Sequence, residues 1–103
     1  MPNLNELIGT VTRTFDRVLH ENPSSLALLG DFESVLKALK LNSGQLLSVQ
    51  ESVTVFKNPV LEQAISIETR IKDLSEEFVV IQVTGHQSGE KSFESEQTWS
   101  VIT

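Results

Sequence analysis

The sequence predicts a single α+β domain spanning residues 1–103, in which an antiparallel sheet packs on one long helix. Three observations predict this fold class. The segment from Ser24 to Leu41 has helical periodicity, and the chain after Gly44 alternates between apolar and polar residues with a period of two. The length of 103 residues suits one hydrophobic core, and no linker, internal repeat or low-complexity stretch divides the chain.

The first segment, residues 4–20, is predicted to be an amphipathic helix. Asn3 and Glu6 have the spacing of a capping box. Gly9 and the threonines that follow it lower helix propensity, so a strand through Gly9–Phe15 is the alternative. The pattern favours the helix because the apolar residues recur at spacings of three and four: Leu4, Leu7, Ile8, Val11, Phe15, Val18 and Leu19.

A second helix is predicted from Ser24 to about Leu41. Pro23 suits the start of a helix, and Asn42–Gly44 is expected to end it. Glu33 and Lys37 form an i,i+4 pair on the solvent side. Asp31 projects from the opposite flank, at the border of the apolar stripe, so its position is not explained by surface pairing alone. The stripe consists of Leu28, Phe32, Val35, Leu36 and Leu39.

Four strands are predicted after Gly44, joined sequentially. Asn58-Pro59 closes the first, residues 72–77 form a polar connection, and Gly85–Gly89 is predicted as a hairpin loop with His86 as a turn residue. Phe93 and Trp99 are expected in the core rather than on a ligand platform. The expected strands cover residues 47–57, 65–72, 78–83 and 93–101.

Composition excludes several classes of function. Eight Lys and Arg against fourteen Asp and Glu give a net charge of −6, which disfavours binding to nucleic acid or to an anionic membrane. The absence of cysteine removes disulfides, thiolate metal sites and cysteine nucleophiles. His20 and His86 are the only histidines, so neither a metal site nor another cofactor is expected.

The chain also shows no targeting pattern. The first twenty residues lack a basic start followed by an apolar run, and no apolar stretch approaches the length of a membrane span. We therefore expect a soluble cytoplasmic protein.

The order of these elements resembles the hot-dog fold of acyl-CoA thioesterases and dehydratases. The stretches that carry the resemblance are Asn22–Val35, then Val53–Val60 with its Phe-x-x-Pro corner (VTVFKNPV), then Ala64–Ile71 and Glu77–Thr84. The resemblance implies a central helix wrapped by an antiparallel sheet of four to five strands, here with an additional N-terminal helix. It also implies a homodimer or higher homo-oligomer, because hot-dog sheets pair edge to edge and form their acyl-CoA sites between subunits.

Asn22 and Asp31 are similar to the motif of phenylacetyl-CoA-type thioesterases, which places an acid nine residues after a His or Asn. The resemblance implies that Asp31 acts as general base or nucleophile and that Asn22 orients the thioester carbonyl. The chain departs from the motif at Pro23, where the family has a glycine whose N–H stabilises the oxyanion. It departs again after Pro59, where Val60 replaces the first residue of the usual Gly-Asp pair.

These observations predict acyl-thioester hydrolysis by a helix-borne aspartate, with acyl-CoA or an acyl-carrier thioester as the ligand. Two alternatives stay open: a non-catalytic hot-dog-like module that binds an acyl thioester or a protein partner, and a small α+β assembly protein unrelated to hot-dog domains. Asp31 also suits the first turns of a helix, where the helix dipole stabilises an acid, and Asn22 suits an N-cap. Lys57 and Lys91 are the cations expected near the mouth of a site.

His20 has two interpretations. It could act as a dehydratase-type histidine facing Asp31 or Glu33, but the glycine-rich surroundings of that motif are absent. A solvent-exposed histidine at a helix end is therefore the favoured interpretation.

Overall fold

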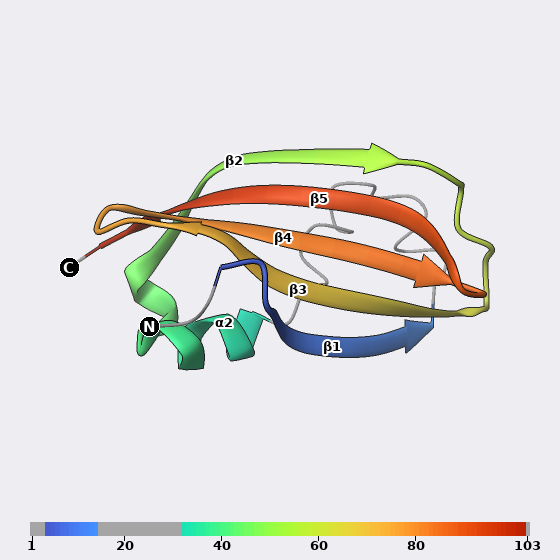
Figure 1. The fold of residues 1–103 in the computed structure, drawn as a ribbon, viewed down its shortest axis with the longest axis horizontal. Helices are drawn as coiled ribbons and strands as arrows, with labels where there is room; N and C mark the ends of the chain where they lie inside the picture. The colour runs from blue at the N-terminus through green and yellow to red at the C-terminus, as the bar shows by residue number, and fades with distance from the viewer. Residues whose placement is uncertain (1–3, 15–31, 103) are drawn as a thin grey trace.

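The structure is a computed structural model that describes residues 4–14 and 32–102. Within these residues, five strands form one antiparallel sheet in the order β1-β3-β4-β5-β2 (Figure 1). The described helix, α2 (Phe32–Leu39), leads through a short 3-10 turn, Ser43–Gln45, into β2. The strands are β1 (Leu7–Thr14), β2 (Leu46–Val55), β3 (Ala64–Leu74), β4 (Phe78–Gln87) and β5 (Glu90–Val101).

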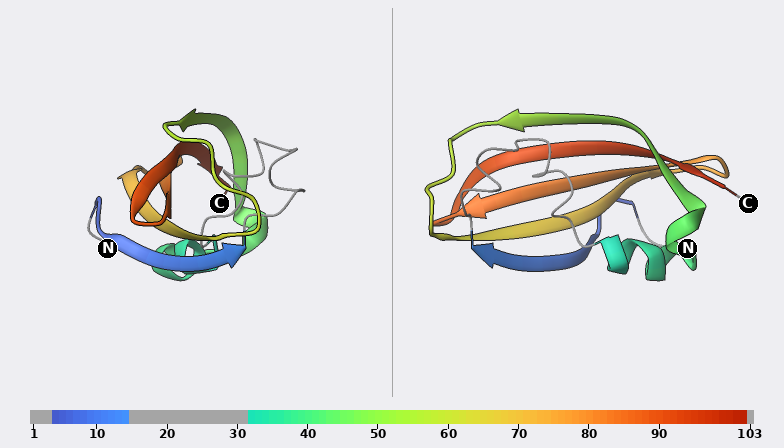
Figure 2. Two further views of the ribbon diagram at one scale, coloured as in Figure 1. Left: turned by 90° about the vertical axis from the view of Figure 1, so that its right-hand side faces the viewer. Right: turned by 180° about the vertical axis from the view of Figure 1, so that it is seen from behind.

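The sheet is strongly curved, and its concave face carries the core. Seen along the long axis, the strands curl around one side of the molecule, with β1 and β2 as the two edges (Figure 2, left). α2 contacts β1 and lies towards the end of the sheet where that strand begins (Figure 1). Its Val35 is fully buried. The other buried apolar residues are Leu46, Ile65, Ile67, Ile71, Val79, Ile81, Val83 and Phe93.

The N-terminal segment is a strand over Leu7–Thr14, so the predicted helix is wrong there and the strand alternative holds. β1 pairs with β3 in antiparallel register, with Val11 opposite Ile67. Thr10, Val11 and Thr12 are β-branched and fit a pleated strand better than a helix. The remainder of that predicted helix, residues 15–20, lies outside the described residues.

α2 lies within the predicted helix 24–41, whose first part, residues 24–31, lies outside the described residues. The helix ends before the predicted Asn42–Gly44 terminator. The Lys40 N–H donates to the Lys37 carbonyl at 3.2 Å, and the Leu41 N–H donates to the Leu36 carbonyl at 3.0 Å. This pair of bonds is a Schellman motif, and it places Lys40 in the left-handed region with φ of 57°.

All four predicted strands after Gly44 are present, but the hairpin loop is shorter than predicted. His86 lies in β4 rather than in a turn, because β4 continues to Gln87 and pairs it with Glu90. The connection is the two-residue turn Ser88-Gly89, with φ of 54° and 76°. Glycine suits the second position because it adopts positive φ without a steric penalty.

Candidate functional site

The structure leaves the predicted catalytic pair undescribed. Asn22, Pro23 and Asp31, together with His20, lie outside the described residues. Asp31 directly precedes α2 in the chain, so the structure describes the helix that follows it. In this helix Glu33 is exposed and Val35 is buried, which agrees with the faces predicted from the sequence.

Three buried polar side chains interrupt the otherwise apolar concave face. Thr69 on β3 is 1% exposed, and Ser95 and Gln97 on β5 are 0% and 5% exposed. Gln97 Oε1 accepts a hydrogen bond from Trp99 Nε1 at 3.0 Å. The Ser95 hydroxyl has no hydrogen-bond partner within residues 4–14 and 32–102. The face of the sheet that carries the core therefore also offers polar groups.

The Phe56–Pro59 corner joins β2 to β3, as predicted, and is held against the start of β5. The N–H groups of Phe56 and Lys57 donate to the Ser92 carbonyl at 2.8 and 3.2 Å. The Ser92 hydroxyl donates to the Lys57 carbonyl at 2.8 Å. The corner is consequently fixed to the β4–β5 hairpin although it lies far from it in sequence.

Lys57 and Lys91, the predicted cations, lie in this same region, and each is paired with a carboxylate. Lys57 contacts Glu90, and Lys91 Nζ lies 2.9 Å from Glu94 Oε2. These hydrogen bonds lower the pKa of the Glu90 and Glu94 carboxyls from their usual range, because the ammonium groups stabilise the charged form. Lys91 Nζ also lies 5.4 Å from the centroid of the Phe56 ring. Both cations are thus largely neutralised within the chain.

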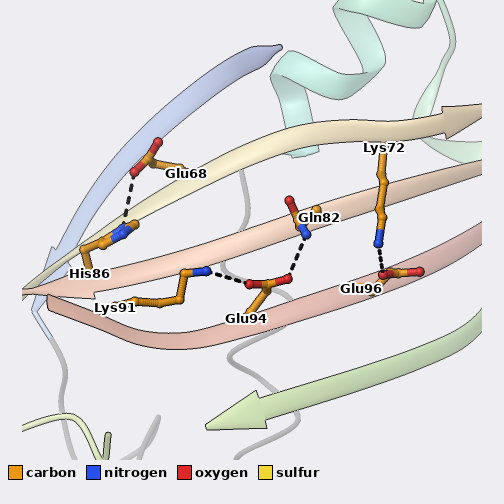
Figure 3. A network of polar contacts seen from close by, with 7 residues as sticks. All are labelled: Glu68, Lys72, Gln82, His86, Lys91, Glu94 and Glu96. Carbon is orange, nitrogen blue, oxygen red and sulfur yellow. Dashed lines mark hydrogen bonds and ion pairs between the residues drawn. The ribbon is translucent and has the colours of Figure 1, made fainter. Parts of the chain in front are cut away.

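The convex face of the sheet carries a network of polar contacts, shown in Figure 3. Glu68 on β3 lies between two basic groups: Oε1 is 3.3 Å from His86 Nδ1, and Oε2 is 3.0 Å from the guanidinium of Arg70. His86 is therefore a cross-strand partner of Glu68. These side chains alternate along β3 with the buried Ile67, Thr69 and Ile71, so they lie on the face opposite the core.

The network continues across β4 and β5. Gln82 Nε2 donates to Glu94 Oε1 at 2.8 Å, and Lys72 Nζ donates to Glu96 Oε2 at 2.7 Å (Figure 3). The hydrogen bond that Lys72 donates to the Glu96 carboxylate raises the pKa of Lys72. Paired charges of this kind suit a face of the sheet that contacts solvent. Each pair contributes little to the stability of the fold. We assign the network a structural role.

The described residues contain no group of three or more His, Asp or Glu side chains arranged to hold a metal ion. Among the same residues no helix has the length and apolar character needed to cross a membrane. Four of the described acids, Glu68, Glu90, Glu94 and Glu96, instead take part in ion pairs with basic side chains.

Solved structures resemble this chain over nearly its whole length. A hypothetical thioesterase from Streptococcus pneumoniae, solved with coenzyme A, aligns with a TM-score of 0.74 at 15% identity, covering 93% of this chain and 86% of that one. A hot-dog-like protein from Thermanaerovibrio acidaminovorans aligns with a TM-score of 0.73 at 14% identity, covering 92% and 80% of the two chains. This chain has the hot-dog fold.

A hot-dog protein need not be an enzyme, and identities this low establish the fold alone. A protein from Streptococcus mutans, bound to acetyl-CoA, aligns with a TM-score of 0.72 at 16% identity over 98% of this chain and 93% of its own. No protein-family model and no curated protein sequence matches the chain. The assembly protein unrelated to hot-dog domains is excluded by the fold.

The sequence analysis missed the buried polar residues of β5. It assigned Phe93, Trp99 and Val101 to one face of that strand, and the same period of two places Ser95 and Gln97 on that face. The alternation of side chains along β5 was therefore enough to place Ser95 and Gln97 on the buried face. By contrast, the contact between Glu68 and His86 depends on the register of β3 against β4, which no local pattern reveals.

Proposed function

We propose that this hot-dog protein hydrolyses an acyl thioester, with Asp31 as the carboxylate and acyl-CoA as the substrate class. The observation that carries the proposal is structural similarity over more than nine-tenths of the chain to proteins solved with coenzyme A and with acetyl-CoA. The nine-residue spacing between Asn22 and Asp31 supports it independently.

The chemistry requires one base and one group to hold the carbonyl. The Asp31 carboxylate takes a proton from water as the water oxygen attacks the thioester carbonyl carbon. The C–S bond then breaks, the thiolate leaves with the bonding electrons and is protonated, and a carboxylic acid remains. The Asn22 side chain orients the carbonyl. Attack by Asp31 itself, followed by hydrolysis of the anhydride, uses the same residues.

Alanine variants of the Streptococcus pneumoniae thioesterase, one at an aspartate and one at a threonine, share this fold with TM-scores of 0.74 and 0.75. An aspartate was thus a residue of interest in that protein. We carry this over to Asp31 only as support for the proposal, since the two sequences are 15% identical.

Pro23 supports a second candidate, a non-catalytic module that binds an acyl thioester or a protein partner. Proline has no N–H, so it cannot donate to an oxyanion from the position where the motif has glycine. Loss of one such donor lowers turnover by about 100-fold or more. A binding module keeps ligand affinity and needs no such donor.

The decisive experiment measures hydrolysis of short, long and aromatic acyl-CoA thioesters by the wild type, Asp31→Asn and Glu33→Gln. Glu33 is a matched control because it is an exposed acid two residues further on. Hydrolysis that is lost in Asp31→Asn and kept in Glu33→Gln supports the assignment. Unimpaired hydrolysis in Asp31→Asn contradicts it. Thermal stabilisation by a thioester without turnover in the wild type favours the binding module.

The proposal includes a homodimer that pairs along the β2 edge. Within the described residues, β2 bonds to β5 on one side only, and no described strand pairs with its other side. Leu47 and Val49 on this strand are 59% and 58% exposed, and Val55 at its end is 45% exposed. A largely exposed edge strand of ten residues, five of them apolar, invites pairing with another strand. A helix at the centre of the sheet stays a prediction, since residues 24–31 lie outside the described part.

Val49→Lys tests the dimer. A lysine on an edge strand opposes strand pairing, so we expect a dimeric wild type and a monomeric variant in sedimentation equilibrium. Thr10→Lys on β1, the other edge, is the control and is expected to leave the dimer intact. A monomeric wild type, or a dimer that resists Val49→Lys and yields to Thr10→Lys, contradicts pairing along β2.

A further inference from the structure

An open groove lies between the C-terminal end of α2, the turn that joins β3 to β4, and the end of β5. Its volume is about 460 Å³, within the range of small-molecule sites. The apolar lining is half-buried and consists of Ala38, Leu39, Leu41, Leu74 and Val101. Lys40, at the end of α2, and Glu76, in the β3–β4 turn, also line it and are exposed. The groove therefore has an apolar floor and a charged rim.

Lys40 occupies an unusual position at this rim. It is the residue after the last helical turn and has a φ of 57°, where helices ordinarily place glycine or asparagine. A lysine there is sterically disfavoured because its Cβ approaches the backbone. Strained residues of this kind concentrate at functional sites, where the role of the side chain offsets the energy of the strained backbone.

The charge of Lys40 is also unmatched. Among the Lys and Arg side chains that the structure describes, Lys37 and Lys40 have no carboxylate within ion-pair distance, although the chain carries a net charge of −6. Of these two, only Lys40 lines the groove. The other four are each paired: Lys57 with Glu90, Arg70 with Glu68, Lys72 with Glu96, and Lys91 with Glu94.

We propose that this groove binds an aliphatic monocarboxylic acid, with the chain on Leu39, Leu74 and Val101 and the carboxylate at Lys40 Nζ. An apolar floor beside one unpaired ammonium matches a molecule with an alkyl chain and a single negative charge. Glu76, which lines the groove from the β3–β4 turn, repels negative charge, which disfavours phosphorylated or dicarboxylic ligands.

The groove is lined by the end of α2, and Asp31 is seven or more positions earlier in the sequence than any lining residue. Hydrolysis of an acyl thioester would release an acid of this class. The proposal stands without that activity, because binding of the acid is measured directly and needs no turnover.

Calorimetric titration with octanoate, octan-1-ol and acetate tests the proposal. We expect the wild type to bind octanoate more tightly than either octan-1-ol, which has the chain without the charge, or acetate, which has the charge without the chain. Lys40→Gln is expected to weaken octanoate binding roughly tenfold or more and to leave octan-1-ol binding unchanged. Lys37→Gln, which removes the other unpaired lysine, is expected to leave both unchanged.

Lys40→Gly separates ligand binding from stability. Glycine relieves the left-handed backbone, so the melting temperature is expected to rise while octanoate affinity falls. Amide NMR shifts on adding octanoate are expected at Leu39–Leu41, Leu74–Glu76 and Val101. Equal octanoate affinity in wild type and Lys40→Gln, or shifts confined to other residues, overturns the proposal. Neither result bears on thioester hydrolysis, which is measured with Asp31→Asn.

Discussion

The side-chain amide of Gln87 forms two hydrogen bonds with the backbone of Val60, as one peptide strand does with another. The Val60 N–H donates to Gln87 Oε1 at 2.7 Å, and Gln87 Nε2 donates to the Val60 carbonyl at 2.9 Å. Gln87 is the last residue of β4 and is 9% exposed, whereas Val60 is exposed, so both bonds are only partly shielded from water. One side chain thereby fastens the loop between β2 and β3 to the β4–β5 hairpin.

Gln87→Ala is predicted to destabilise the protein by about 2 kcal/mol, because it leaves two half-buried backbone groups unpaired. Gln87→Glu is predicted to restore part of the loss only at low pH, where the carboxylic acid again donates a proton to the Val60 carbonyl. Urea denaturation at pH 7 and pH 4 measures both. A Gln87→Ala variant as stable as wild type would show that water replaces the amide without cost.

Ser95→Ala is predicted to stabilise the protein by about 1 kcal/mol. The Ser95 hydroxyl is fully buried and has no hydrogen-bond partner in the described part of the chain, and removing an unpaired buried polar group is favourable. Ser92→Ala is the matched control on the same strand. Ser92 is 3% exposed and donates to the Lys57 carbonyl at 2.8 Å, so its loss is predicted to cost about 1 kcal/mol. The melting temperature should rise in Ser95→Ala and fall in Ser92→Ala. A shift in the same direction in both variants contradicts this account.

Gly85→Ala is predicted to destabilise the fold by about 2–3 kcal/mol. A Cβ at Gly85 would overlap the ring of Phe93, which is fully buried against it on the neighbouring strand. Phe93→Leu in the Gly85→Ala background should recover part of the loss, giving a favourable coupling between the two positions. Gly44→Ala is the control, since no atom lies near the added methyl. Equal melting temperatures for the two alanine variants would contradict the overlap.

Glu94→Gln is predicted to reduce the loss of folding free energy that occurs as the pH falls from neutral to acidic. The hydrogen bond from Lys91 lowers the pKa of Glu94 below its ordinary value of 4.5, so the unfolded chain takes up the proton first as pH falls. The stability contributed by this carboxylate is complete above pH 4.5 and is lost as pH drops through the lowered pKa. Since Glu94 is partly exposed, the effect should be below about 1 kcal/mol. Denaturation between pH 2 and pH 7 measures it, and a loss of folding free energy as large in Glu94→Gln as in the wild type would contradict the prediction.

Much of the fold follows from local sequence pattern. The alternation after Gly44 predicts all four later strands, and the apolar stripe of the helix places Val35 in the core. The prediction that is wrong concerns β1, which was expected to be part of a helix. Its apolar residues also fit helical spacing, and what decides in favour of the strand is pairing with β3, a partner fifty positions away that a local window does not contain.

The features of the candidate site also differ in whether local sequence can predict them. The spacing of Asn22 and Asp31 is local and can be read from the chain, whereas the surroundings of His86 depend on strand register. The glycines at 85 and 89 suggested a long loop, but only Gly89 serves the turn, while Gly85 makes room for Phe93. The role of Lys40 has no sequence signal, because the Schellman position ordinarily holds glycine.

The strand order also has a consequence for folding. β3, β4 and β5 follow one another along the chain and form a local meander, whereas β1 and β2 join its two edges from far upstream. Closing long loops is entropically costly, so the meander is expected to form first and the edge strands to dock late. In native-state hydrogen exchange, amides of β4 should open only with global unfolding, and those of β2 should exchange through partial opening. The edge proposed to pair with a second copy is therefore also one of the two parts of the sheet that are expected to be completed last.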